Sequence, residues 1–342
     1  MTARGSYVAL QNITRELNRT TMPRLPPAPG FDGEEEYMKQ VAIWKGWIEW
    51  EKEDPLVLKD EDVDAYRGRI IYVYKQAVMA LRFWPQIWCE AAEFCFRNDK
   101  ESEGNDFLVQ GIAANPESCL LAFKRADRLE LTATGEQGQD SVERRATAVR
   151  EPYDTCLDAL YDLHDKTRLR EQQAIARIRE NFAQMASAPP NEMKEDAEDD
   201  EQNEDEAPDA KEAILRMQIE AIQKGNAMQL QLLERIISFT WIACMRSLRR
   251  IKGKGAQFTA NSGLRGVLQE ARSKGRITPD LYIHAALMEW HCYKDPVAQR
   301  LFDKAFKLYP TNENVALEYL KFLINNDDIT SKSLQFSPTS NH

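Results

Sequence analysis

The stretch 44-WKGWIEWEKEDPL-56 decides the fold, because it sets three tryptophans at intervals of three residues. In a helix Trp44, Trp47 and Trp50 lie along one side, with Glu51 directly after them. Such a row can be a site whose rings stack on RNA bases or on a cofactor. It can equally be a face that a neighbouring helix covers. A structural signature should recur along the chain, whereas a binding site need not, so the remaining sequence separates the two interpretations.

The tryptophan ladder recurs at the same i, i+3, i+6 spacing, with other apolar residues in its three positions; we name each such segment helix A. An acidic residue follows several copies, as at Glu51, Glu130 and Glu289. Trp241 opens a further copy whose ladder is spaced by four and then three residues. The regular ladders are Trp44, Trp47 and Trp50; Trp88, Ala91 and Phe94; Phe123, Ala126 and Leu129; Tyr282, Ala285 and Met288; and Ala316, Tyr319 and Phe322.

A second signature alternates with the first: a large apolar residue followed three positions later by a small one, which we name helix B. A small residue at such a place lets two helices approach closely, and the large one fills the neighbouring groove. The copies of helix B are Tyr74 with Ala77, Leu108 with Gly111, Tyr153 with Cys156, Leu268 with Ala271, and Phe302 with Ala305.

The two signatures repeat at matched intervals. The small residue of helix B precedes the first residue of the next helix A by 11 or 12 positions, and the shortest distance from A to B is 23. The unit is therefore a helix pair of about 34 residues, which is a solenoid period. A proline, which suits a turn or the first position of a helix, falls in each short gap. These prolines are Pro85, Pro116, Pro279 and Pro310.

A helix pair of this kind cannot bury its apolar face alone and must stack on its neighbours. We therefore predict an all-α, right-handed α-solenoid in which the tryptophans are core residues and not a base-stacking site. The structural residues of the repeat are predicted to be Trp44, Trp47, Trp50, Ala77, Trp88, Phe123, Tyr153, Trp241, Ala271, Tyr282, Phe302 and Ala305.

One gap breaks the rule, because Trp241 lies 85 positions after Cys156. The flanks of this gap, "KTRLREQQAIARIRENFAQM" and "KEAILRMQIEAIQ", are typical of helices. We expect them to form an elongated antiparallel hairpin that protrudes from the array, with an interruption of its second arm at Gly225 and Asn226. The predicted divisions are an orphan helix and proline-rich connector over 1–30, repeats over 31–165 and 241–328, hairpin arms over 166–188 and 211–240, an acidic disordered linker over 189–210 and a disordered tail over 329–342.

The charge of the chain is concentrated in that linker. Net charge is −10, and residues 195–209, "EDAEDDEQNEDEAPD", hold ten acidic residues and no basic one. Without this run, the remaining 45 acidic residues balance 45 basic ones. Such a segment has almost nothing to bury and is predicted to be disordered. The alternatives to a plain linker are an acidic competitor of RNA and a docking strip for a basic partner.

Other features narrow the class of protein. The sequence has no apolar run long enough to span a membrane and no secretory signal at its N-terminus. Its six cysteines include no C-x-x-C pair, which favours free thiols in a reducing compartment. Its four histidines form no metal-binding pattern, and "IKGKGAQF" at 251–258 lacks the phosphate-loop spacing. We therefore expect no enzyme, no cofactor and no metal.

One basic cluster is a candidate for contact with RNA or phosphate. Its five cations lie within nine residues at the predicted end of the Trp241 helix. Cations at a helix C-terminus interact favourably with the helix dipole, so these residues can have a purely structural role. They could also bind phosphates with a salt-dependent affinity. The cluster comprises Arg246, Arg249, Arg250, Lys252 and Lys254.

The repeats resemble the HAT (half-a-TPR) repeat, in which helix A carries an aromatic residue, a bulky residue three positions on and a trailing acid, as in "WIEWE". The connector "RTTMPRLPPAPGF", the block "WIEWEKEDPL" and the stretch "AALMEWHCYKDPVAQRLFDKAFKLYP" resemble fungal members of the Suppressor-of-forked family. This family comprises the large HAT subunit of cleavage stimulation factor and its counterpart in fungal cleavage factor IA. The resemblance covers residues 1 to 328.

The resemblance implies a nuclear scaffold for mRNA 3′-end cleavage and polyadenylation, with the cytoplasm as an additional location left open. Family members form homodimers through their C-terminal HAT half and hold an RNA-binding subunit through a C-terminal segment. Here residues 5–18 and 316–323 are unpaired helices and the sequence after Ile329 departs from the family. We expect an interior piece of a longer array, with weakened dimerisation and indirect contact with RNA. A scaffold for splicing or pre-rRNA processing and a direct RNA-binding module are the alternatives.

Overall fold

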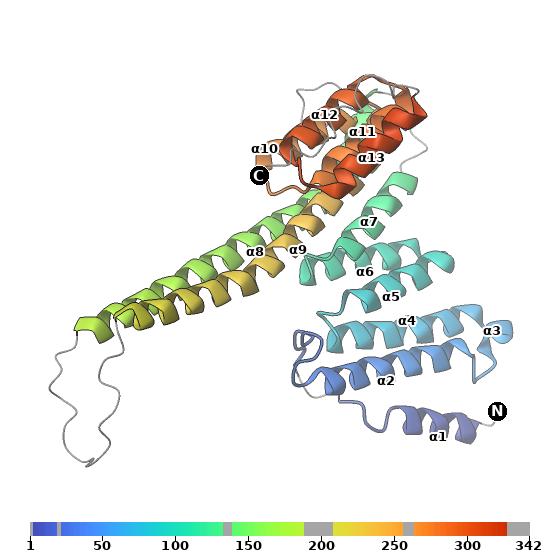
Figure 1. Ribbon diagram of the computed structural model, residues 1–342. Helices are drawn as coiled ribbons and strands as arrows, with labels where there is room; N and C mark the ends of the chain where they lie inside the picture. The colour runs from blue at the N-terminus through green and yellow to red at the C-terminus, as the bar shows by residue number, and fades with distance from the viewer. Residues whose placement is uncertain (1–2, 19–21, 133–138, 188–207, 256–262, 327–342) are drawn as a thin grey trace, which may run out of the picture. The chain divides into compact units, whose positions relative to one another are not determined.

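The computed structural model describes residues 3–18, 22–132, 139–187, 208–255 and 263–326, and in these ranges all regular structure is helical (Figure 1). The all-α class predicted from the repeat is therefore confirmed. Residues 188–207, which hold most of the acidic run, the tail after residue 326 and parts of three connecting segments lie outside the described residues. The last residues of the predicted linker, 208–210, belong instead to the first turn of α9. The chain divides into two compact units, residues 1–156 and 157–342, and α8 continues from the first into the second.

The first unit is a stack of helices that follow the predicted alternation of A and B. The A ladders fall on α2, α5 and α7, and the B pairs on α4, α6 and the first part of α8. Consecutive helices pack on one another from α4 to α7, and the A helices α5 and α7 also touch directly. The helices are α1 (Ala3–Ile13), α2 (Glu34–Lys52), α3 (Leu58–Glu61), α4 (Val63–Ala80), α5 (Pro85–Arg97), α6 (Glu101–Ala114), α7 (Cys119–Thr132) and α8 (Gln139–Ser187).

Local sequence explains where several of these helices begin. Pro85 is the first residue of α5, a position where the missing N–H of proline costs nothing. The Asp62 carboxylate accepts a hydrogen bond from the Ala65 N–H at 2.9 Å and caps α4. The first predicted helix is shorter than residues 5–18, because α1 ends at Ile13.

The second unit continues the alternation, with A ladders on α9, α11 and α13 and B pairs on α10 and α12. The A helices α9, α11 and α13 contact each other in order, and each B helix packs beside its neighbours. Pro279 begins α11, and the Asn312 side chain caps α13. The helices are α9 (Pro208–Lys252), α10 (Gly263–Lys274), α11 (Pro279–Tyr293), α12 (Val297–Leu308) and α13 (Glu313–Asn325).

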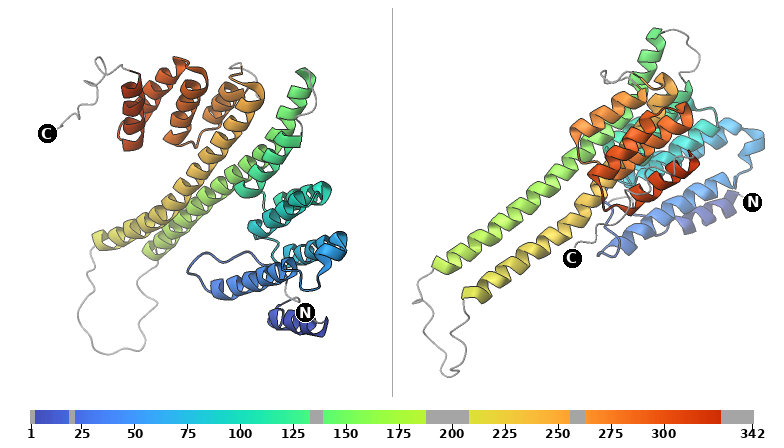
Figure 2. Two further views of the ribbon diagram at one scale, coloured as in Figure 1. Left: turned by 90° about the vertical axis from the view of Figure 1, so that its right-hand side faces the viewer. Right: turned by 45° about the horizontal axis from the view of Figure 1, so that its top comes forward.

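In the second unit α8 and α9 run antiparallel as a two-helix arm that extends beyond α10 to α13 (Figures 1 and 2). Two contacts join the arm at its base: Trp241 Nε1 donates to Tyr161 Oη at 3.2 Å, and His164 Nε2 lies 3.7 Å from Glu234. The predicted interruption at Gly225 is wrong, since α9 passes through it as a continuous helix. One glycine in a helix lowers the stability of that helix by about 1 kcal/mol. This is too little to end α9, which runs beside α8.

Candidate interaction surfaces

The tryptophans of the opening stretch lie inside the first unit. Trp44, Trp47 and Trp50 are 3%, 7% and 9% exposed. The rings of Trp44 and Trp47 stack on each other with centroids 5.5 Å apart. Trp47 Nε1 donates to the Glu51 carboxylate at 3.3 Å. Rings covered in this way offer no free face to a nucleic-acid base.

The other residues of the repeat signature are also covered by neighbouring helices. Phe123 is half-buried and its ring lies 5.6 Å from that of Tyr153; both rings belong to the first unit. In the second unit, the Phe302 ring stacks on Tyr319 at 5.4 Å. The remaining buried signature residues are Ala77, Trp88, Trp241, Ala271, Tyr282 and Ala305.

The small residue of helix B allows neighbouring helices to approach closely, as its size predicted. A Cβ atom added at Gly111 on α6 would lie 3.0 Å from Cβ of Trp88 on α5 and 3.2 Å from Leu121 on α7. Both neighbours belong to A helices of the stack, so Gly111 is where three helices meet. The large residue of an A signature and the small residue of a B signature thus pack on each other.

Two of the three acidic residues that follow the A ladders, Glu51 and Glu289, are buried, and each is held by an arginine of a B helix. In the first unit Arg69 on α4 donates to both oxygens of Glu51, at 3.0 and 2.9 Å. In the second unit Arg265 on α10 does the same to Glu289, at 2.6 and 3.0 Å. A bidentate pair of this geometry fixes the relative rotation of two helices as well as their distance.

A second carboxylate, Asp295, joins the arginine of the second unit to the turn between α11 and α12. It accepts hydrogen bonds from Lys254 Nζ at 2.7 Å, Arg265 Nη2 at 2.8 Å and the Val297 N–H at 3.0 Å. The Lys254 hydrogen bond, helped by the Val297 N–H, holds the pKa of Asp295 well below its usual value. The segment after α9 is thereby tied to the start of α12.

The predicted basic cluster lies at the end of α9, as expected, and is partly used by this network. Arg249, Arg250 and Lys252 occupy the last helical turn, where cations stabilise the helix dipole. Lys254 is paired with Asp295. Arg249 has a buried Nε without a hydrogen-bond partner among the described atoms.

The exposed Arg246 of this cluster lies beside α11. Arg246 Nη2 lies 3.4 Å from Nδ1 of His284. Burial, and then the charge of Arg246, lower the pKa of His284, which favours the neutral form of this ring. Arg250 donates to the Ser247 hydroxyl at 3.0 Å. The five cations are therefore brought to one end of α9, but they do not form a uniform open patch.

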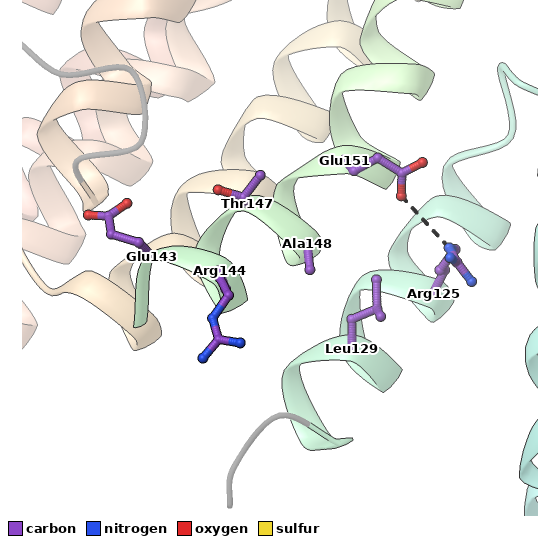
Figure 3. Close-up of a pocket in the computed structure, with 7 residues that line it drawn as sticks. All are labelled: Arg125, Leu129, Glu143, Arg144, Thr147, Ala148 and Glu151. Atoms are coloured by element: carbon purple, nitrogen blue, oxygen red, sulfur yellow. Dashed lines mark ion pairs between the residues drawn. The ribbon is translucent and has the colours of Figure 1, made fainter. Parts of the chain in front are cut away.

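A shallow groove of about 530 Å³ lies between α7 and α8 in the first unit (Figure 3). Leu129 of α7 and Ala148 of α8 point toward each other across it. Arg125 and Glu151 form an ion pair of 3.9 Å at its edge. Apolar and charged contacts of this kind suit a protein side chain. The lining residues are Arg125, Leu129, Glu143, Arg144, Thr147, Ala148 and Glu151.

Two further observations bear on the class of protein. Among the described residues, no three His, Cys, Asp or Glu side chains are grouped so that they could hold a metal ion. No helix in the described ranges is both long and apolar enough to cross a membrane.

The pairing of these arginines with the trailing acids, and the part played by Asp295, were not predicted from the sequence, in which Arg265 was only a possible extension of the basic cluster. Arg69 lies 18 residues after its carboxylate, whereas Arg265 lies 24 residues before the equivalent one. The two pairs therefore share no sequence spacing. The only signal was the trailing acid itself, which marked one half of each pair.

Comparison with known proteins identifies the family. The family model described as Suppressor of forked protein matches residues 1–338. The chain belongs to the Suppressor of forked family. This match confirms the family resemblance that was predicted from the tryptophan ladders. The alternating A and B helices of the structure are consistent with the repeats of this family.

Several fungal relatives of this Suppressor of forked chain bear the name mRNA 3′-end-processing protein rna14. The Aspergillus fumigatus protein is 58% identical over 340 residues, which are 99% of this chain and 32% of the relative. The Emericella nidulans protein is 56% identical over 339 residues, and the Gibberella zeae protein 48% identical over 345 residues. These matches cover 99% and 100% of this chain and 31% and 33% of the relatives. The chain thus spans about a third of the length of these proteins.

Proposed function

We propose that this chain is part of a non-catalytic scaffold in mRNA 3′-end cleavage and polyadenylation, where it organises other protein subunits on the surfaces of its helical repeats. The observation that carries the proposal is the family match along residues 1–338, together with relatives that are named for mRNA 3′-end processing. Because these relatives are about three times as long, the activity and partners of the whole protein are part of the proposal.

The packing supports a role based on geometry. The A ladders and the arginines that pair with the buried carboxylates hold successive helices at defined rotations, so outward-facing side chains keep fixed positions. Grooves such as that between α7 and α8 offer apolar and charged contacts at protein scale. Within each unit, helices fixed in this way can hold partners at set distances from one another.

The proposed place of action is the nucleus, because 3′-end cleavage acts on nuclear transcripts. We propose that contact with RNA is indirect and is made through partner subunits. The partial use of the basic cluster supports this, since Lys254 is paired with Asp295 and Arg246 lies beside His284. Dimerisation, which the family likeness implies, is proposed for the whole protein.

A stoichiometry experiment tests the scaffold role. Removing the full-length protein from a fungal nuclear extract should abolish cleavage of a pre-mRNA at its poly(A) site. Adding the purified protein back should restore cleavage in proportion to the amount added, until each complex holds its fixed number of copies. An enzyme would restore the reaction in far smaller amounts, and that result would contradict the proposal.

The partners can be tested with the chain itself. A tagged copy incubated with the same extract should recover subunits of the cleavage and polyadenylation machinery, identified by mass spectrometry. Recovery of splicing or pre-rRNA factors without cleavage factors would favour the alternative scaffold.

A further inference from the structure

Helix α9 carries an apolar stripe on the outer part of the arm. Ile214, Met217, Met228 and Leu232 are 50%, 69%, 75% and 56% exposed. At 3.6 residues per turn these four residues and Ala221 fall within a sector of about 60°. Large apolar side chains that lie next to one another on an exposed surface indicate a site of interaction.

This stripe is separate from the seam that packs on α8. Leu233 and Ile237 are 5% and 0% exposed and belong to a row that also includes Leu215 and Ile222. The helical repeat places this row about 140° around α9 from the exposed stripe. α9 therefore has two apolar faces, and α8 uses only one of them.

Charges beside the stripe have a single sign. Lys224 and Arg235 border it, and neither has an acidic partner among the described side chains. The carboxylates of this part of α9 point elsewhere: Glu212 pairs with a neighbouring arginine, Glu234 lies against α8, and Glu220 falls outside the stripe sector. The surface is thus apolar with basic side chains along one edge, the edge of Met217.

We propose that this stripe binds an amphipathic helix of a partner protein, one with apolar residues at heptad spacing and carboxylates beside them. A helix that lays its apolar face along such a row buries side chains at i, i+3, i+4 and i+7, and methionines adapt readily to a partner's shape. Acidic flanks complement Lys224 and Arg235 and exclude basic partners. The inference depends only on the arm and stands independently of the role in 3′-end processing.

Two other occupants fit less well. A second copy of α9 would bring Lys224 and Arg235 of both chains into one interface, where like charges repel. The acidic run of residues 195–209 supplies carboxylates, but its only apolar residues are alanine and proline. Neither combines large apolar side chains with negative charge.

Paired peptides test the proposal on the whole chain. Two synthetic helices carry the same leucines at heptad positions a and d, with glutamates at e and g in one and lysines in the other. In fluorescence anisotropy titrations at physiological ionic strength, the acidic peptide should bind at least about tenfold more tightly than the basic one. The double variant Met217→Asp with Leu232→Asp should abolish binding. The double variant Lys224→Glu with Arg235→Glu should reverse the preference.

A matched control uses the same arm. Gln223→Asp with Ala227→Asp places two charges at exposed positions of α9 outside the stripe and should leave binding unchanged. Circular dichroism of each variant should retain the helical signal. Equal binding of both peptides, or equal loss in the control, would overturn the proposal. Self-association in sedimentation velocity that Met217→Asp with Leu232→Asp removes would assign the stripe to a second copy instead.

Discussion

Two helical glycines of this chain lie in opposite surroundings. A Cβ at Gly111 would meet Trp88 at 3.0 Å, whereas nothing lies within 4 Å of one at Gly225. We expect Gly111→Ala to lower the free energy of unfolding by about 1–3 kcal/mol, because the Trp88 Cβ cannot move without its helix. Gly225→Ala should raise it by about 0.5–1 kcal/mol through helix propensity. Urea unfolding measures both. A stabilised Gly111→Ala would refute the close approach of α5 and α6.

Asp295 should give the stability of the second unit a specific pH dependence. Its folded pKa is lowered, so its contribution is fully present above the unfolded pKa of about 4 and is lost as pH falls through the folded value. The stability difference between the wild type and Asp295→Asn should therefore be largest near neutral pH and shrink below about pH 4. Urea unfolding at a series of pH values measures this difference.

The control for this prediction removes the first cause of the lowered pKa. In a Lys254→Met background, Asp295→Asn should produce a smaller stability difference at neutral pH, with less change on acidification. An unchanged pH profile in that background would show that Lys254 does not set the pKa of Asp295.

At the scale of helices, the half-buried arginines that pair with the buried carboxylates Glu51 and Glu289 connect A to B helices. Arg69→Met should be more destabilising than the double change Arg69→Met with Glu51→Leu, because the single change leaves a buried carboxylate without its partner. A double-mutant cycle should give a coupling of about 1–3 kcal/mol. The cycle on Arg265 and Glu289 should give a larger coupling, since Arg265 is less exposed than Arg69.

An exposed ion pair that also starts on α2 provides the comparison for this cycle. Lys45 and Glu90 form an ion pair of 2.8 Å in which both side chains are about 40% exposed. Solvent and salt weaken such a pair, and its coupling should lie below about 1 kcal/mol. If the Lys45 pair and the pairs of the buried carboxylates Glu51 and Glu289 gave equal couplings, the role assigned to the trailing acids would be contradicted.

For the whole molecule, the question is whether the chain itself holds RNA. If contact is indirect, a single-stranded RNA should bind this chain weakly. Its affinity should fall at least about tenfold between 50 and 200 mM salt, because the release of counterions from RNA is less favourable at higher salt. Filter binding over this salt range measures the affinity. Binding that persists at high salt and disappears in Arg249→Glu with Arg250→Glu would instead make the end of α9 a direct RNA site.

The helical nature of the repeats could be predicted from sequence because its cause is local. A helix that buries one face must repeat its apolar residues at helical spacing, and a proline must fall where no N–H is needed. The ladders of Trp88 and Tyr282 therefore marked their helices, and Pro85 and Pro279 marked where two of them begin.

Only the tertiary structure decided which groups meet across helices. Glu51 is paired with an arginine that follows it and Glu289 with one that precedes it, because a carboxylate between two B helices can turn to either. The course of α9 through Gly225 was likewise decided by packing, which outweighs the propensity of a single residue. The exposed face of the arm also required coordinates, since the sequence of α9 has two apolar rows and α8 covers only one.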